Sequence, residues 1–271
     1  MTLVAPARVA VVPVAAGAAL RPLLAGPTRE GTLLGAGDRA AWARFGDEVL
    51  ILAPPGGVRM PNGVEVPPAL LGGRAAGDEC LVGDGALAVG DWRLRAVRWW
   101  DSRPALPPTD PVLLRRRAAV AGDCFAPVAD AGLGAALMAG DPAAVLGAAQ
   151  QLIGNGAGLT PLGDDVLAGA MASAFLLGRA AGRDGLWQMV AGVAPTLLAT
   201  ARERTTGLSA TLLRHACRGE VDEASAALLQ ALCGRGDPPA ALESLLALGH
   251  TSGRGLATGL LAGAAAAGGA P

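Results

Sequence analysis

The chain contains no lysine and no tyrosine, so all 22 of its basic residues are arginine. Without lysine there is no Walker A phosphate-binding loop, no Schiff base and no anchor for pyridoxal phosphate. Histidine occurs only twice, at His215 and His250, and this excludes a metal centre built from several imidazoles. The sequence therefore excludes these classes of site.

The chain has few cysteines and almost no net charge. Its four cysteines form no C-x-x-C pair, and unpaired thiols are typical of the reducing cytoplasm, where we expect the protein to work. A net charge of −1 argues against nucleic acid as a partner. The last apolar stretch, 255–270, is rich in alanine and glycine and too weakly hydrophobic for a membrane span. We expect a closely packed, buried helix there.

The pattern of the sequence changes near residue 110. Before that point, Asp-Gly and Gly-Asp turns separate short apolar runs, which is typical of β-hairpins. The predicted strands include Val49–Ala53, Gly63–Val66, Cys80–Val82, Ala86–Val89 and Trp92–Trp100. The segment 102–111 carries four prolines and is the predicted linker.

After the linker the pattern is helical almost to the end. The predicted helices are Val112–Ala121, Ala143–Ile153, Pro161–Ala181, Leu186–Glu203, Leu208–Arg218, Asp222–Cys233, Pro238–Leu248 and Ser252–Ala267. Gly-Asp-Pro at 140–142 and 236–238 are helix-start signals. The predicted fold class is α+β, with a small antiparallel β unit, sandwich or barrel-like, followed by an all-helical domain. The predicted domains are 1–110, rich in strands, and 111–271, which carries the site.

The candidate binding site is a glycine-rich loop before a helix. Gly154, Gly156 and Gly158 alternate, as suits a loop that needs positive φ angles and turns successive amides toward an anion. Thr160 and Pro161 then predict a helix start, where the helix dipole favours negative charge. A glycine in the first turn destabilises a helix, so Gly163 indicates a close approach to the backbone.

Two aspartates follow the loop, Asp164 and Asp165. Adjacent helical residues point about 100° apart, so we expect one to stabilise the helix start and the other to meet a substrate amide or a hydrated magnesium ion. A capped helix whose glycines allow close packing is the structural alternative. A Rossmann fingerprint is disfavoured, because the spacing is G-x-G-x-G and a helix precedes it.

Two further polar segments, 202–209 and 250–254, lie near predicted helix starts, and with the loop they would form an anion pocket if they converge. The candidate catalytic residues are Asp164, Asp165 and His250. The candidate substrate-binding residues are Gly156, Gly158, Thr160, Gly163, Arg204, Thr206, Ser209, Thr251, Ser252 and Gly253. No metal ligands are assigned, and His215 is interpreted as a core or groove residue.

The string GAGLTPLGDD at 156–165, with Gly169 after it, resembles the G-x-G-L-T-P-S-G-D-D-x-x-x-G signature of a bacterial domain family that includes the AllH subunit of oxamate carbamoyltransferase. The likeness continues at 206–209 and 249–253. Two departures stand out: Leu162 replaces the usual serine, and Arg254 follows the late Thr-Ser-Gly where an acidic residue is common.

The resemblance implies a subunit of a multi-protein carbamoyltransferase of allantoin breakdown, which moves a carbamoyl group between carbamoyl phosphate and an amide such as oxamate. It implies a small anionic ligand, namely carbamoyl phosphate, phosphate or an oxamate-like molecule, and as partners other subunits or a second copy. No cofactor is assigned, and magnesium stays an alternative. Two other functions stay open: a non-catalytic partner or scaffold subunit, and a small-metabolite-binding protein of another reaction class.

Overall fold

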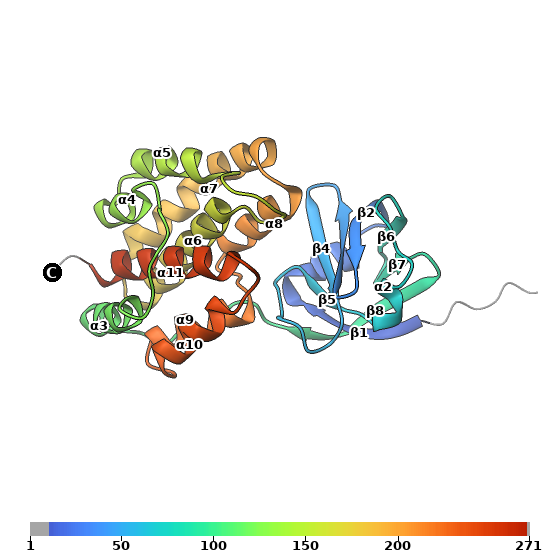
Figure 1. Ribbon diagram of the computed structural model, residues 1–271, viewed down its shortest axis with the longest axis horizontal. Helices are drawn as coiled ribbons and strands as arrows, with labels where there is room; N and C mark the ends of the chain where they lie inside the picture. The colour runs from blue at the N-terminus through green and yellow to red at the C-terminus, as the bar shows by residue number, and fades with distance from the viewer. Residues whose placement is uncertain (1–10, 270–271) are drawn as a thin grey trace, which may run out of the picture. The chain divides into compact units, whose positions relative to one another are not determined.

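The computed structural model describes residues 11–269. The chain divides into two compact units, the first ending at Asp101 and the second beginning at Ser102 (Figure 1). Each unit has its own hydrophobic core.

In residues 11–101, the described part of the first unit, eight strands form a closed barrel in the order β1-β5-β4-β3-β2-β6-β7-β8. The strands are β1 (Val11–Gly17), β2 (Arg29–Gly37), β3 (Ala40–Phe45), β4 (Glu48–Ala53), β5 (Gly63–Glu65), β6 (Glu79–Gly83), β7 (Ala86–Val89) and β8 (Trp92–Trp100). Three short helices join them: η1 (Ala18–Leu20), α1 (Arg21–Ala25) and α2 (Pro68–Leu71). Inward-facing side chains such as Leu33, Phe45 and Leu94 fill the interior.

The predicted fold class is wrong, because the sheet of this unit is mixed and not antiparallel throughout. β1 pairs with β8 in parallel, from Val11 opposite Arg93 to Gly17 opposite Trp100, and β4 pairs with β5 in parallel. The Asp-Gly and Gly-Asp turns report only on strands joined by a hairpin. The first pair closes the barrel between strands far apart in sequence, and the second follows a crossover through 54–62, so no local signal marks either.

The predicted strands from 49 onward are confirmed by β4 to β8. Asp84 and Gly85 both have positive φ, 49° and 78°, as the two-residue turn between β6 and β7 requires. The sequence pattern did not predict β1, β2 and β3, where alanine and glycine dilute the apolar alternation. Their place in the sheet comes from pairing with distant strands.

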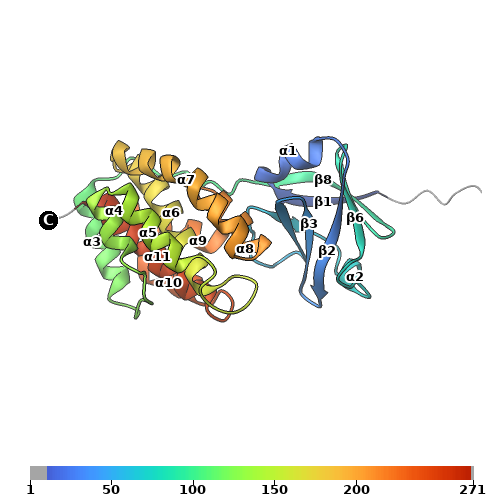
Figure 2. The same cartoon turned by 90° about the horizontal axis from the view of Figure 1, so that it is seen from above.

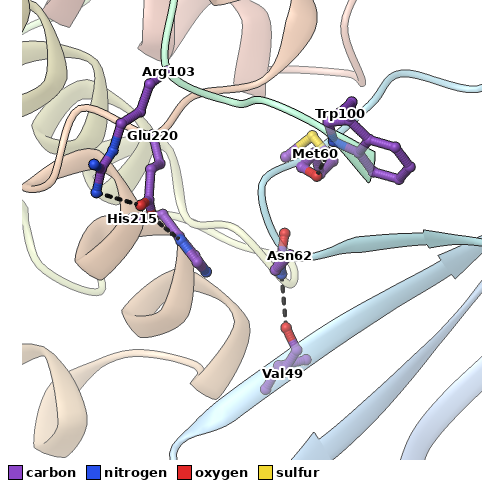
Figure 3. A network of polar contacts seen from close by, with 7 residues as sticks. All are labelled: Val49, Met60, Asn62, Trp100, Arg103, His215 and Glu220. Atoms are coloured by element: carbon purple, nitrogen blue, oxygen red, sulfur yellow. Dashed lines mark hydrogen bonds and ion pairs between the residues drawn. The ribbon is translucent and has the colours of Figure 1, made fainter. Parts of the chain in front are cut away.

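Side-chain hydrogen bonds tie the crossover between β4 and β5 to the sheet. Asn62, which is fully buried, donates from Nδ2 to the carbonyl of Val49 at 2.7 Å, and Trp100 donates from Nε1 to the carbonyl of Met60 at 3.1 Å (Figure 3). The backbone amide of Ile51 donates to the carbonyl of Asn62 at 2.9 Å. The parallel pair is thus held by groups outside the regular ladder.

The second unit is helical in its described part, which ends at residue 269. Its helices are α3 (Pro111–Gly122), α4 (Leu133–Ala139), α5 (Pro142–Leu152), α6 (Leu162–Ala180), α7 (Asp184–Arg204), α8 (Gly207–Ala216), α9 (Glu223–Leu232), α10 (Pro238–Leu246) and α11 (Ser252–Gly268). All eight predicted helices are confirmed, and Asp141 and Asp237 cap α5 and α10 as the Gly-Asp-Pro signals predict. The missed helix, α4, has only seven residues between two glycines.

Helices α6 and α11 lie side by side in the middle of this unit (Figures 1 and 2). An added Cβ at Gly259 of α11 would overlap the carbonyl oxygen of Val166, and one at Gly169 of α6 would overlap that of Leu256. The two backbones therefore approach as closely as glycine allows. This packing confirms the buried, small-residue helix expected near the end of the chain.

The proline-rich segment before α3 lies against the helical unit. Thr109 donates its backbone amide to the carbonyl of Ala180 at 2.8 Å, and Asp110 caps α3 by accepting from the amides of Val112 and Leu113. The chain thus passes into the second unit at Ser102, nine residues before the first helix. The domain boundary between 110 and 111 stays a prediction.

The described residues contain neither a disulfide bond nor a membrane-spanning helix. All four cysteines are free, with Cys80, Cys217 and Cys233 buried and Cys124 exposed. Between residues 11 and 269, no helix has the length and apolar character needed to cross a bilayer.

Candidate functional site

The glycine-rich loop runs from the end of α5 to the start of α6. Its three alternate glycines have φ angles of 75° at Gly154, 127° at Gly156 and 95° at Gly158. Side chains other than glycine are strained in this region of φ. The predicted need for glycine at these positions is confirmed.

The free amides of this segment lie in the loop and not in the first turn of the helix. Gly163 donates its amide to the carbonyl of Asn155 at 2.8 Å, and the amides of Asp164 and Asp165 donate to the carbonyl of Pro161 at 3.0 and 3.2 Å. Among the described residues, by contrast, no acceptor receives the amides of residues 156–158, which are exposed. An anionic ligand would therefore contact the amides of the loop and not those of the first turn of α6.

Two glycines predicted to bind substrate are explained by packing. An added Cβ at Gly163 would overlap the carbonyl oxygen of Leu152, and one at Gly253 would overlap that of Leu245. The close approach inferred from Gly163 is therefore real, but the approaching group is the protein's own backbone. Both residues are buried.

Asp164 holds the loop in place. It is 3% exposed, its Oδ1 accepts the amide of Gly154 at 2.9 Å, and its Oδ2 accepts the hydroxyl of Thr205 at the end of α7. Both carboxylate oxygens are thus engaged by the chain itself. Asp164 fits the stabilising member of the aspartate pair.

Asp165 is the other member, and its side chain is only partly satisfied. It is 5% exposed, and its Oδ2 is buried without a hydrogen-bond partner. Burial raises the pKa of Asp165 from 3.8 to about 7, a hydrogen bond from Ser252 opposes this, and the nearby charges of Asp164 and Asp222 add to the increase. A buried carboxyl with a free oxygen and a pKa near neutrality suits proton transfer or amide recognition.

The start of α8 touches the loop through Thr206. Its hydroxyl accepts the amide of Ser209 at 3.1 Å, which caps the helix, and donates to the carbonyl of Leu159 at 2.6 Å. Ser209 is 3% exposed, and its own hydroxyl is buried without a partner. Arg204 instead donates to the carbonyl of Gln150 at 2.9 Å on the exposed side of α5.

The N-terminal end of α11 is the third segment that contacts the loop. Thr160 and Ser252 share a hydrogen bond of 2.9 Å between their hydroxyls, so Thr160 does not cap α6 as predicted. Thr251 is the N-cap residue of α11 but makes no side-chain capping bond, and both it and His250 are exposed. The three polar segments named from the sequence are therefore brought together, although His250 makes no contact in the cluster.

Two polar groups of the helical unit were not predicted from the sequence. Asp222 caps α9, accepting the amide and the hydroxyl of Ser225 at 2.9 and 2.6 Å, and the spacing Asp-x-x-Ser was the available signal. Glu220 accepts from Arg103 at 2.8 Å and lies 2.6 Å from His215 Nδ1 (Figure 3). Burial alone would raise the pKa of Glu220, but His215 and Arg103 lower it overall.

No metal centre is evident. In the part of the chain from 11 to 269, no three histidine, cysteine, aspartate or glutamate side chains are grouped closely enough to hold one ion. Each carboxylate oxygen of Asp164 already accepts a hydrogen bond from the chain. What the cluster offers is a carboxyl group, two hydroxyls and loop amides.

The loop, both aspartates and the starts of α8 and α11 fall in one stretch of sequence. Residues 152–264 match the model of the oxamate carbamoyltransferase subunit AllH family. The resemblance predicted from the glycine-rich signature is confirmed for this AllH-like segment. No curated protein and no solved structure matched the chain.

Proposed function

We propose that this protein is a subunit of a carbamoyltransferase and that its AllH-like segment, residues 152–264, binds a small amide-bearing anion beside Asp165. The observation that carries the proposal is the buried Oδ2 of Asp165, which no protein donor reaches. Orphaned buried carboxylate oxygens are costly and call for an explanation. The AllH family, described as an oxamate carbamoyltransferase subunit, supplies the candidate chemistry.

The chemistry that this site would support is transfer of a carbamoyl group between phosphate and an amide nitrogen. The nitrogen of the acceptor bonds to the carbamoyl carbon, the bond from that carbon to the phosphate oxygen breaks, and a proton leaves the nitrogen. Asp165 has a pKa of about 7, so near neutral pH it is able to take that proton. The loop amides and the hydroxyl of Ser209 would stabilise the developing oxyanion.

Isothermal titration of the full chain with oxamate and with carbamoyl phosphate tests the proposal. We expect both to bind, and we expect Asp165→Ala to weaken both. Asp38→Ala is the matched control, because Asp38 is exposed in the turn between β2 and β3. Phosphate release in the assembled enzyme should fall by about 10²–10⁴ for Asp165→Ala, as expected for loss of an acid–base group.

The proposal fails if neither compound binds the wild-type chain. If Asp165→Ala then also leaves assembly with partner subunits intact, the chain is a non-catalytic member of its complex.

A further inference from the structure

The outer face of α3 is apolar. Three large apolar side chains of this one helix, Val112, Leu113 and Val120, are 47%, 42% and 52% exposed. Arg116 and Ala119 are exposed beside them. We call these five residues the α3 face. At about 100° per residue they cover an arc of about 120° on the helix surface, with Arg116 at its centre.

The opposite side of α3 is apolar as well. Leu114, Ala118 and Ala121 are buried in the core of the helical unit, and the helix packs on α10 and α11 at the edge of that unit (Figure 1). A helix at the surface of a lone domain normally carries polar side chains on its outer face. Exposed apolar patches on a folded protein mark contacts with other molecules. The α3 face is therefore a candidate for a protein interface.

Arg116 indicates the chemistry of the surface that would cover α3. Its neighbours on the helix surface, three and four residues away, are all apolar: Val112, Leu113, Ala119 and Val120. Among the described residues, no acidic side chain pairs with Arg116. Arginine and apolar side chains are enriched at the centres of protein interfaces, where the guanidinium pairs with a carboxylate of the partner. The covering surface should therefore present an acidic side chain among apolar ones.

The central position of Arg116 disfavours a second copy of the chain as the partner. Two copies related by a twofold axis use the same patch, so a contact centred on the α3 face would bring the two Arg116 side chains together. Like charges placed opposite each other in an interface oppose association. A different protein that carries a carboxylate at this point fits the α3 face better.

We propose that the α3 face is the docking surface for a partner subunit, which packs an amphipathic helix on Val112, Leu113 and Val120 and pairs a carboxylate with Arg116. Such a contact lays the apolar side of one helix on another, with anchors three and four residues apart. The inference rests on the proposed function only in that the chain is a subunit of a complex. It adds the surface through which this subunit assembles.

Cys124 is a natural reporter for coverage of the α3 face. It is exposed and follows Val120 by one turn, with its Sγ 3.3 Å from the carbonyl oxygen of Val120. The other three cysteines are buried, so a maleimide modifies Cys124 first. When the full chain assembles with the separately purified subunits of the carbamoyltransferase, the reaction at Cys124 should slow by about tenfold or more, because thiol reactivity depends on access.

Two substitutions test the chemistry of the partner in binding titrations of the full chain with the same subunits. Arg116→Glu places a like charge against the partner's carboxylate and should weaken assembly by about thirtyfold or more. Leu113→Ser removes one apolar contact and should weaken it by about threefold to tenfold. Arg39→Glu is the matched control, because Arg39 is an exposed arginine in the turn between β2 and β3. All three side chains are exposed, so the urea midpoints should stay close to that of the wild type.

Sedimentation equilibrium of the full chain alone tests the second copy. We expect Arg116→Glu and Leu113→Ser to leave the oligomeric state of the isolated chain unchanged. A dimer that either substitution dissociates would assign the α3 face to a second copy and overturn the proposal. The proposal is also overturned if the chain forms no complex with the carbamoyltransferase subunits, if both variants assemble like the wild type, or if Cys124 reacts equally fast in the complex and alone.

Binding of oxamate and carbamoyl phosphate separates the docking surface from the proposed function. If the wild-type chain binds both compounds and the two α3 variants still assemble, only the docking surface is wrong. If the wild-type chain binds neither compound and the two variants fail to assemble, the docking surface stands and the chain is a non-catalytic subunit.

Discussion

At the scale of single residues, two neighbouring aspartates have different roles: Asp164 stabilises the loop, and Asp165 is the candidate for chemistry. The two carboxylate oxygens of Asp164 accept hydrogen bonds from the amide of Gly154 and the hydroxyl of Thr205, whereas one oxygen of Asp165 has no hydrogen-bond partner. Successive residues of a helix point about 100° apart, so one backbone position presents its carboxylate to the loop and the next presents it to the buried cluster. The order of the pair is therefore important, and the two are not interchangeable.

Replacing Asp164 by alanine should destabilise the protein. The amide of Gly154 and the hydroxyl of Thr205 would lose their acceptor in a place shielded from water, which costs about 2–4 kcal/mol in the free energy of unfolding. Urea denaturation of Asp164→Ala beside the exposed control Asp38→Ala measures this difference. Equal midpoints for the two variants would contradict the structural role of Asp164.

Replacing Asp165 by asparagine should stabilise the protein at high pH and not at low pH. The pKa is about 7 in the folded chain against 3.8 for an ordinary aspartate, so between these values the folded state binds the extra proton and stability falls as pH rises. The full shift in pKa lowers the free energy of unfolding of the wild type by at most about 4 kcal/mol above pH 7, and it has no effect below pH 4. Thermal unfolding at pH 4 and pH 8 measures it.

Asn has no such titration, so the advantage of Asp165→Asn over the wild type should grow from pH 4 to pH 8. A difference between the two proteins that does not vary with pH would show that Asp165 titrates as an ordinary aspartate. Asp38→Asn again serves as the control.

At the scale of elements, the contact between α6 and α11 sets the position of the site. Gly255, Gly259 and Gly263 lie four residues apart on one face of α11, and an added Cβ at any of them would crowd α6. At Gly255 that Cβ would lie 2.7 Å from the Cβ of Asp165. The helix pairing therefore places the first turn of α11, with Ser252, against Asp165.

Gly259→Ala should separate the two helices and destabilise the protein by about 1–3 kcal/mol, the usual cost of overpacking a core. Gly192→Ala in α7 is the matched control, because nothing lies within 4 Å of its added Cβ and alanine favours a helix by about 0.5–1 kcal/mol. The two substitutions should thus have opposite signs in urea denaturation. Stabilisation by both would show that α11 does not pack on α6 through this face.

At the scale of the whole molecule, the segment 102–110 belongs energetically to the helical unit. Val221 donates its amide to the carbonyl of Ser102 at 2.9 Å, Arg103 pairs with Glu220 at 2.8 Å, and Thr109 donates to Ala180. Arg103 is more than half exposed, so its ion pair contributes little by itself. The backbone hydrogen bonds therefore contribute most to holding the segment 102–110 against the helical unit.

A fragment of residues 102–271 should therefore fold alone and unfold cooperatively, and it should be more stable than the fragment 111–271 by about 1–3 kcal/mol. Circular dichroism during urea titration compares the two. Equal stability would favour the domain boundary at 110 that the sequence predicts, and failure of both fragments to fold would show that the helical unit depends on the barrel.

The sequence by itself determined most of the helices and the glycine loop, because caps, glycine φ preferences and helical periodicity are local properties of the chain, whereas the site residues named from it stay a prediction. Only the tertiary structure decided which aspartate is free, why Gly163 is a glycine, and that β1 and β8 close a barrel in parallel. The physical reason is common to all three. Each depends on a partner outside the local pattern, such as Thr205 for Asp164, and the sequence near each residue carries no record of that partner.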